Sequence, residues 1–248
     1  AIKTLNLKRE FDADEQENVL QRFFREAEAA GRLHHPHIVT IYDAGEANDM
    51  AYIAMEYLTG TDLRFYTRED SLLPPLSVVK IGMKLADALA YAHSNDIIHR
   101  DIKAANVMYD PQSGQLKITD FGIARLTDSR RTKTGMVLGT PSSMSPEQLR
   151  GKELDGRTDL YSLGVLLYQL LSGQLPYKAD SLTQLMVKIT SGDPADLVSL
   201  RPELKERGQC IVEIVDKLLQ KDVDNRYQDG KKLSRDLLAC AKSMAAGK

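Results

Sequence analysis

The chain has 248 residues, with 33 Lys or Arg and 35 Asp or Glu, which gives a formal net charge of −2. This length fits one large domain or two adjoining lobes, and the near-neutral charge does not indicate nucleic acid or an anionic membrane as the main partner. No apolar run approaches a membrane span and the first residues lack a signal-peptide pattern, so we predict a cytoplasmic protein or the cytoplasmic part of a larger, membrane-anchored one. Cys210 and Cys240 have no metal-ligand spacing, which predicts reduced thiols.

The first 33 residues predict a strand, a charged loop and a helix. Residues 1–5 alternate as a strand does, and apolar residues recur at helical spacing from about Glu15 to Leu33. Glu26 lies seven residues from both Val19 and Leu33, so it falls on the apolar face of this helix. A carboxylate there needs a cation, for which Lys3 is the natural partner. The alternative is a surface glutamate near the edge of that face.

Residues 34–98 predict more of a small sheet and then a long helix. Strands are predicted over Ile38–Asp43 and Met50–Tyr57, joined by a turn at residues 45–49. Together with residues 1–5 they form part of an antiparallel sheet, with one helix against it. A polar connector over residues 64–75 ends in two prolines, and a helix follows from about Leu76 to Ser94.

The stretch from residue 99 to residue 122 holds most of the residues that could carry chemistry. It contains Asp101, Lys103, Asn106 and Asp120, and two short apolar runs flank a turn with Pro and Gly at residues 110–114. This pattern predicts a hairpin, which would bring Asn106 and Asp120 side by side. Oxygen ligands of this kind suit Mg²⁺, which usually binds together with phosphates. A further carboxylate at the same place can orient or deprotonate a hydroxyl group.

The remainder of the chain predicts a long irregular segment followed by helices. Residues 120–147 have little periodicity, and loops of this length in compact domains are usually functional or disordered. A nearly all-apolar helix is predicted over Asp159–Leu171, with amphipathic helices at residues 181–191 and 209–220 and a last helix after residue 227. From Lys242 onward we predict a small polar tail.

Two motifs in this order resemble a known family. His-Arg-Asp-Ile-Lys-Ala-Ala-Asn at residues 99–106, followed by Asp-Phe-Gly at residues 120–122, is similar to the catalytic loop and the metal-binding motif of protein kinases. Lys103, two residues after Asp101, fits serine/threonine rather than tyrosine kinases, and nearly the whole chain resembles the eukaryotic-like serine/threonine kinases of bacteria. The resemblance implies an α+β, bilobal kinase fold, with a small, truncated β-rich N-lobe at residues 1–57 and a mainly helical C-lobe at residues 58–248. The glycine-rich loop of the family is not in the sequence, which starts at Ala1.

The resemblance assigns roles to the polar residues already singled out. Asp101 would orient or deprotonate the substrate hydroxyl, and Lys103 would steady the transferred phosphoryl group. Asn106 and Asp120 would hold Mg²⁺. Lys3 would hold the phosphates of ATP, braced by an ion pair with Glu26.

The resemblance also implies where the nucleotide base and ribose would bind. Residues 55–58 are similar to the kinase hinge, with Met55 guarding the back of the adenine pocket. The Glu56 carbonyl and the Leu58 amide would meet the adenine edge, and Asp62 would contact the ribose. Ala1 and Met108 complete the set of expected nucleotide contacts.

Residues 120–147 resemble a kinase activation segment. Its end, Ser145-Pro146-Glu147, is similar to the family's Ala-Pro-Glu anchor, and Arg226 would pair with Glu147. Asp159 would brace the backbone of the catalytic loop. Thr132 and Thr134 lie where bacterial kinases of this kind are autophosphorylated, and a phosphate there could pair with Arg100. The alternative is a flexible loop with incidental threonines.

We therefore expect an ATP- and Mg²⁺-dependent serine/threonine protein kinase that phosphorylates proteins, including its own activation loop. Protein substrates are the expected partners, with self-association for phosphorylation in trans. Two alternatives remain open on the same fold. One is a catalytically impaired fragment or scaffold that binds partners, which the missing glycine-rich loop favours. The other is transfer to small molecules, against which the long activation segment argues.

Overall fold

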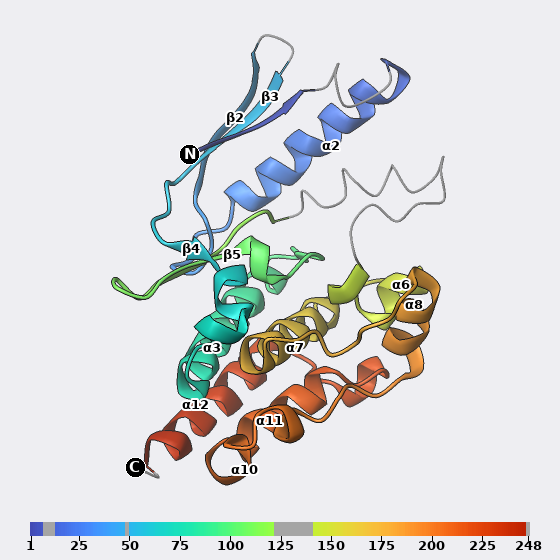
Figure 1. Cartoon of the computed structure of the whole chain (residues 1–248). Helices are drawn as coiled ribbons and strands as arrows, with labels where there is room; N and C mark the ends of the chain where they lie inside the picture. The colour runs from blue at the N-terminus through green and yellow to red at the C-terminus, as the bar shows by residue number, and fades with distance from the viewer. Residues whose placement is uncertain (7–12, 48–49, 122–140, 247–248) are drawn as a thin grey trace.

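The computed structural model describes residues 1–6, 13–47, 50–121 and 141–246. At one end of the molecule, three antiparallel strands form a sheet in the order β1-β3-β2, and helix α2 lies along one face of it (Figure 1). These elements are β1 (Ile2–Asn6), α2 (Ala13–Gly31), β2 (Ile41–Ala47) and β3 (Met50–Met55). A small core of its own holds them together, made of Val19, Phe23 and Ala27 from α2 with Ala51 and Ile53 from β3.

A second antiparallel sheet, in the order β4-β5-β6, follows along the chain. Its strands are β4 (Thr61–Asp62), β5 (Val107–Asp110) and β6 (Gln115–Ile118). Strands β5 and β6 form the hairpin predicted from the sequence, with Gly114 in the left-handed region at a φ of 71°. An isolated parallel bridge between Ile38 and Ile118 connects this hairpin to the segment that precedes β2.

The rest of the described chain is mainly helical. The helices are α3 (Pro75–His93), α6 (Pro146–Leu149), α7 (Arg157–Ser172), α8 (Leu182–Ser191), α9 (Leu197–Leu200), α10 (Leu204–Arg207), α11 (Gln209–Leu218) and α12 (Gly230–Ala246). Short 3₁₀ turns lie at Leu63–Thr67, Glu69–Ser71, Ala104–Asn106, Pro141–Ser143 and Val223–Asn225. The α+β arrangement predicted from the sequence, with a small β-rich part and a mainly helical part, is confirmed.

Helix α7 is the centre of the larger core, as its nearly all-apolar sequence predicted. It is buried on almost every side, and α3 and α11 pack against it (Figure 1). A Cβ added at Gly164 of α7 would lie 2.6 Å from the Cβ of Leu218 in α11, so only glycine permits this close approach. Helix α12 lies along α3 and closes the far side of this core.

The structure corrects three element boundaries. Strand β2 continues to Ala47, so the turn begins later than predicted. Helix α2 begins at Ala13, inside the stretch that we expected to be a loop. Residues 242–246 belong to α12 and not to a tail, because the buried side chains of Leu233, Leu237 and Cys240 recur at helical spacing and anchor this helix.

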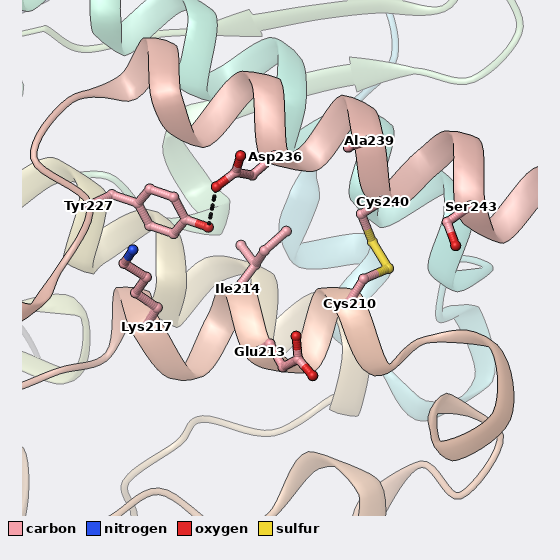
Figure 2. Close-up of a pocket in the computed structure, with 9 residues that line it drawn as sticks. All are labelled: Cys210, Glu213, Ile214, Lys217, Tyr227, Asp236, Ala239, Cys240 and Ser243. Atoms are coloured by element: carbon pink, nitrogen blue, oxygen red, sulfur yellow. Dashed lines mark hydrogen bonds between the residues drawn. A yellow bond between two sulfur atoms is a disulfide. The ribbon is translucent and has the colours of Figure 1, made fainter.

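The prediction of reduced thiols is wrong. Cys210 of α11 and Cys240 of α12 form a disulfide, with their Cα atoms 5.6 Å apart (Figure 2). The two residues are 30 positions apart in the chain, and packing of α11 against α12 brings them together. Among the described residues, no helix is long and apolar enough to cross a membrane.

We expect the double variant Cys210→Ala, Cys240→Ala to unfold more easily than the natural sequence. Closing a loop across 30 positions removes entropy from the unfolded chain, so its loss should lower the free energy of unfolding by about 3 to 4 kcal/mol. Denaturant unfolding with and without a reductant measures this. The reductant should destabilise the natural sequence by the same amount and leave the double variant unchanged; an equal effect on both would contradict a stabilising disulfide.

Candidate active site

A buried carboxylate fixes the backbone of residues 99–101. Asp159, in the first turn of α7, is fully buried. Its Oδ2 accepts hydrogen bonds from the backbone amide of His99 at 2.8 Å, and its Oδ1 from that of Arg100 at 2.7 Å. His93, at the end of α3, contacts Oδ2 through its Nε2 at 2.8 Å. Arg100 has a φ of 69°, which is an uncommon conformation for a residue other than glycine and which these hydrogen bonds stabilise.

His99 links this loop to the strand that carries Asp120. The Asp101 amide donates to Nδ1 of His99 at 3.2 Å, which makes Nε2 the protonated nitrogen of the ring. Nε2 therefore donates to the carbonyl of Thr119, 2.8 Å away. The ring also packs edge-on against Phe121, with 4.6 Å between ring centroids. His99 is fully buried, so both nitrogens are satisfied within the protein.

Asp101, Lys103 and Asn106 form one polar cluster. The Asn106 amide nitrogen donates to Oδ2 of Asp101 and to its backbone carbonyl, both at 2.9 Å. The Lys103 ammonium lies 2.7 Å from the same Oδ2. Both donors contact Oδ2, and neither of these contacts involves the other carboxylate oxygen, Oδ1. The cluster is partly exposed, with 28% of the Asp101 side chain accessible.

The hairpin brings Asn106 and Asp120 together, as predicted. Val107 pairs with Ile118, and the Thr119 amide donates to the Asn106 carbonyl at 2.9 Å. Asp120 follows directly with a φ of 62°, a left-handed conformation that aspartate tolerates better than most residues. The metal-ligand pair inferred from the sequence therefore sits where the two strands end.

Lys3 contacts a different carboxylate from the one expected. Its ammonium lies 2.6 Å from Oδ1 of Asp120, and the expected ion pair with Glu26 does not occur among the contacts of the described residues. Glu26 does lie on the inward side of α2, because its Oε2 is fully buried. Lys3 and Asp120 are each about a third exposed, so solvent partly screens the attraction between their charges.

The side-chain oxygens of Asn106 and Asp120 suit a magnesium ion that also binds phosphates. Because the Asn106 nitrogen is used toward Asp101, the amide oxygen is held on the other side of the group. This oxygen and the Asp120 carboxylate are two hard ligands. Mg²⁺ that also binds phosphates and water typically takes only one or two ligands from the protein. The Lys3 ammonium beside Asp120 adds the positive charge that phosphates require.

The predicted hinge connects the two sheets through a buried ion pair. Glu56 Oε1 accepts a hydrogen bond from the Thr40 amide at 2.7 Å and pairs with the Lys117 ammonium. Lys117, on β6, also donates to the Ile38 carbonyl at 3.1 Å. This network fixes the Glu56 side chain. Glu56 directly follows β3 in the chain. Sequence analysis missed Lys117, because a lysine within a strand is usually exposed.

The other expected nucleotide contacts surround the same region. Asp62 pairs with Met108 across β4 and β5. Its carboxylate binds the Arg64 side chain, and hydrogen bonding by Arg64 holds the pKa of Asp62 below its usual range. Ala1 pairs with Met55: the amide of Met55 donates to the Ala1 carbonyl at 2.9 Å. Leu58 is partly exposed.

The predicted pair of Glu147 and Arg226 is formed. Two parallel hydrogen bonds of 2.7 and 2.8 Å join the side chains, both of which are buried. Burial alone would raise the pKa of Glu147, but the hydrogen bonds and charge of Arg226 outweigh it and hold the pKa below the ordinary glutamate value. The stabilisation is therefore complete above that ordinary value and is lost as pH falls through the lowered one.

Gln148 and Thr158, which the sequence did not single out, connect this pair to the catalytic loop. Thr158 directly precedes Asp159 in the chain, and its hydroxyl donates a hydrogen bond to Glu147 at 2.9 Å. The Gln148 side chain donates to the Arg100 carbonyl, also at 2.9 Å. Thr132 and Thr134, the predicted phosphorylation sites, lie outside the described residues, so their relation to Arg100 remains a prediction.

Comparisons with known proteins agree with this geometry. The protein kinase domain family matches residues 1–237. Serine/threonine-protein kinase PrkC of Bacillus subtilis is 37% identical over 238 residues, covering 96% of this chain and 36% of that protein. Serine/threonine-protein kinase pkn3 of Myxococcus xanthus is 42% identical over 198 residues, covering 76% of this chain and 36% of the relative. The chain thus spans little more than a third of these relatives.

Solved structures show the same fold. The Mycobacterium tuberculosis PknI kinase domain matches with a TM-score of 0.72 and 28% identity, over 97% of this chain and 84% of that one. Rad53 residues 1–466, in complex with AMP-PNP, match with a TM-score of 0.75 and 27% identity, over 94% and 56% of the two chains. The chain belongs to the protein kinase domain family. Its similar curated relatives are bacterial serine/threonine kinases of the eukaryotic-like type.

We expect Arg226→Met to lower the free energy of unfolding by about 3 to 5 kcal/mol, because it leaves the buried Glu147 carboxylate without its cation. Lys232→Met is the matched control. Lys232 forms an exposed pair with Asp236 four residues away, so this change should cost less than about 0.5 kcal/mol. Chemical denaturation at neutral pH measures both variants; equal losses would contradict a structural role for the buried pair.

Proposed function

We propose that this chain is the catalytic domain of a serine/threonine protein kinase that transfers the γ-phosphate of ATP to protein hydroxyl groups. The observation that carries the proposal is the convergence of Asp101, Lys103, Asn106 and Asp120 on one partly exposed site, with Lys3 from the small sheet beside Asp120. Family membership and the kinase names of its relatives support the same activity. Residues 1–57 would form a partial N-lobe and residues 58–248 the C-lobe.

Asn106 and Asp120 would hold Mg²⁺, which would neutralise phosphate charge during transfer. Lys3 would leave Asp120 and contact the nucleotide phosphates instead. Glu26 would then brace Lys3, since its buried oxygen lies on the inward side of α2. The backbone of Glu56 and Leu58 would bind the adenine edge, with Asp62, Met108 and Ala1 nearby. The match to Rad53 in complex with AMP-PNP supports ATP as the nucleotide.

Asp101 would position the attacking hydroxyl of a serine or threonine. Its Oδ2 is held by Asn106 and Lys103, so Oδ1 is the oxygen that would accept the hydroxyl proton. The substrate oxygen forms a bond to the γ-phosphorus as the bond to the β-phosphate oxygen breaks, and ADP leaves. Lys103 lies beside Asp101, where its ammonium group would neutralise negative charge on the transferred phosphoryl group.

Substrates and partners follow from the same assignment. Proteins are the proposed substrates, including this chain's own Thr132 and Thr134, which requires self-association if phosphorylation occurs in trans. Phosphates there would pair with Arg100. The proposed location is the cytoplasm, where ATP is available. A scaffold that binds partners without transfer is the second candidate, favoured by the ion pair that Lys3 makes with Asp120 in place of Glu26.

Asp101→Asn should lower the rate of phosphate transfer by about 100-fold or more, because an amide cannot accept the hydroxyl proton. The measurement is incorporation of labelled phosphate from ATP with Mg²⁺ into a basic protein and into the chain itself, with mass spectrometry at Thr132 and Thr134. Asp96→Asn is the matched control: it makes the same change at an exposed residue before the loop. Full activity in Asp101→Asn would exclude the proposed role, and no activity in the natural sequence would favour the scaffold.

Asp120→Asn should raise the Mg²⁺ concentration needed for half-maximal transfer by about tenfold or more, because it removes the charged member of the ligand pair. Asp110→Asn changes a carboxylate in the hairpin turn that binds Ser113 and should leave the magnesium requirement unchanged. The rate is measured across a magnesium titration. An identical titration curve for Asp120→Asn and the natural sequence would refute the metal assignment.

A further inference from the structure

The disulfide between α11 and α12 borders an open pocket that the proposed kinase chemistry does not use. Figure 2 shows the residues that line the pocket, which has a volume of about 480 Å³ and lies beside the sulfur atoms. Its lining comes from α11, α12 and Tyr227 between them: Cys210, Glu213, Ile214, Lys217, Tyr227, Asp236, Ala239, Cys240 and Ser243. We propose that Cys210 is a site of reversible modification by low-molecular-weight thiols, which reach its sulfur through this pocket.

The two cysteines differ in their access to solvent. Cys210 lies in the first turn of α11 and is partly exposed. Cys240 is 3% exposed and belongs to the larger apolar core, with Leu237 and Ala241 on the same face of α12. Thiol exchange requires a thiolate to approach the sulfur that it attacks. The structure therefore favours attack at Cys210, with Cys240 as the leaving sulfur.

The pocket also has the charges to receive a small zwitterionic thiol. Lys217 supplies an ammonium group, held 4.6 Å from the centre of the Tyr227 ring. Glu213 and Asp236 supply carboxylates, and Asp236 also accepts a hydrogen bond from the Tyr227 hydroxyl at 3.1 Å. Asp236 also pairs with Lys232, so in a cysteine-containing amino acid or short peptide the carboxylate would meet Lys217 and the ammonium group would meet Glu213. Glutathione is a suitable probe of this class.

The exchange balances as two successive substitutions. A small thiolate attacks the Cys210 sulfur, a mixed disulfide forms at Cys210, and the Cys240 sulfur leaves as a thiolate that takes up a proton. A second small thiolate attacks the small-molecule sulfur of the mixed disulfide, releasing the Cys210 thiolate and a small-molecule disulfide. The protein disulfide gains two electrons, and two small thiols are oxidised. The reverse sequence restores the protein disulfide.

The fold keeps the modification reversible. Helices α11 and α12 remain packed on α7 and α3 by apolar contacts other than the disulfide, so the two cysteines should stay near each other after reduction. A Cα separation of 5.6 Å falls in the ordinary range for disulfides, so the bond can form again without backbone movement. The chain has two cysteines, so no third thiol competes.

Single-cysteine variants test which sulfur is accessible. Cys240→Ala leaves only Cys210, and Cys210→Ala leaves only Cys240. On incubation of the folded chain with oxidised glutathione, we expect Cys240→Ala to form the mixed disulfide at least about tenfold faster, as measured by intact mass. In denaturant the two variants should react at equal rates, which shows that the fold causes the difference. Equal rates in the folded state, or faster reaction at Cys240, would overturn the proposal.

The natural sequence provides a second test that does not depend on the variants folding. The oxidised chain is incubated with reduced glutathione under native conditions, quenched with acid at intervals and mapped by mass spectrometry. We expect a transient glutathione adduct on Cys210 while the chain remains folded by circular dichroism. An adduct on Cys240, or reduction that occurs only as fast as global unfolding, would overturn the proposal. Neither test depends on kinase activity, so each outcome is independent of the proposed function.

Discussion

The buried carboxylate of Asp159 is the constraint on which the candidate site depends. Removing this charge from water is costly unless it is fully hydrogen-bonded, and it obtains its partners from the His99 and Arg100 amides and from His93. Helix α7 is enclosed by the core, so these hydrogen bonds fix the loop that carries Asp101 relative to α7. The hydrogen bonds that offset the cost of burying this carboxylate therefore also fix the backbone next to Asp101.

The site itself lies between two separately packed units. Lys3 belongs to the small sheet, whereas Asp101, Asn106 and Asp120 belong to the larger unit. The units meet through polar contacts and also through apolar ones, since Ala30 of α2 and Leu33 just after it belong to the larger core. The pair of Lys117 with Glu56 and the bridge between Ile38 and Ile118 keep the hinge near the hairpin. Such connections hold the two units in register; under the proposed function, Lys3 and Asp120 would separate when phosphates bind.

Two long-range connections stabilise the helical part at different places. Arg226 ties the segment ending at Glu147 to the region before α12, and the disulfide ties α11 to α12. The first is buried and keeps its strength at neutral pH, because the carboxylate pKa is lowered. The second borders a pocket on the surface, where its chemistry depends on the thiols around it. The ion pair between Glu147 and Arg226 therefore persists under conditions in which the disulfide is reduced.

The sequence by itself determined the longer helices, the hairpin and the polar set at residues 101–120, and it indicated the family. Local periodicity and turn residues specify such features without distant contacts. Only the tertiary structure decided that Lys3 meets Asp120 and not Glu26, that Lys117 is buried in an ion pair, and that Cys210 meets Cys240. Each of these pairs joins residues from different elements far apart in the chain. Their proximity depends on how helices and strands pack, which a local pattern does not encode.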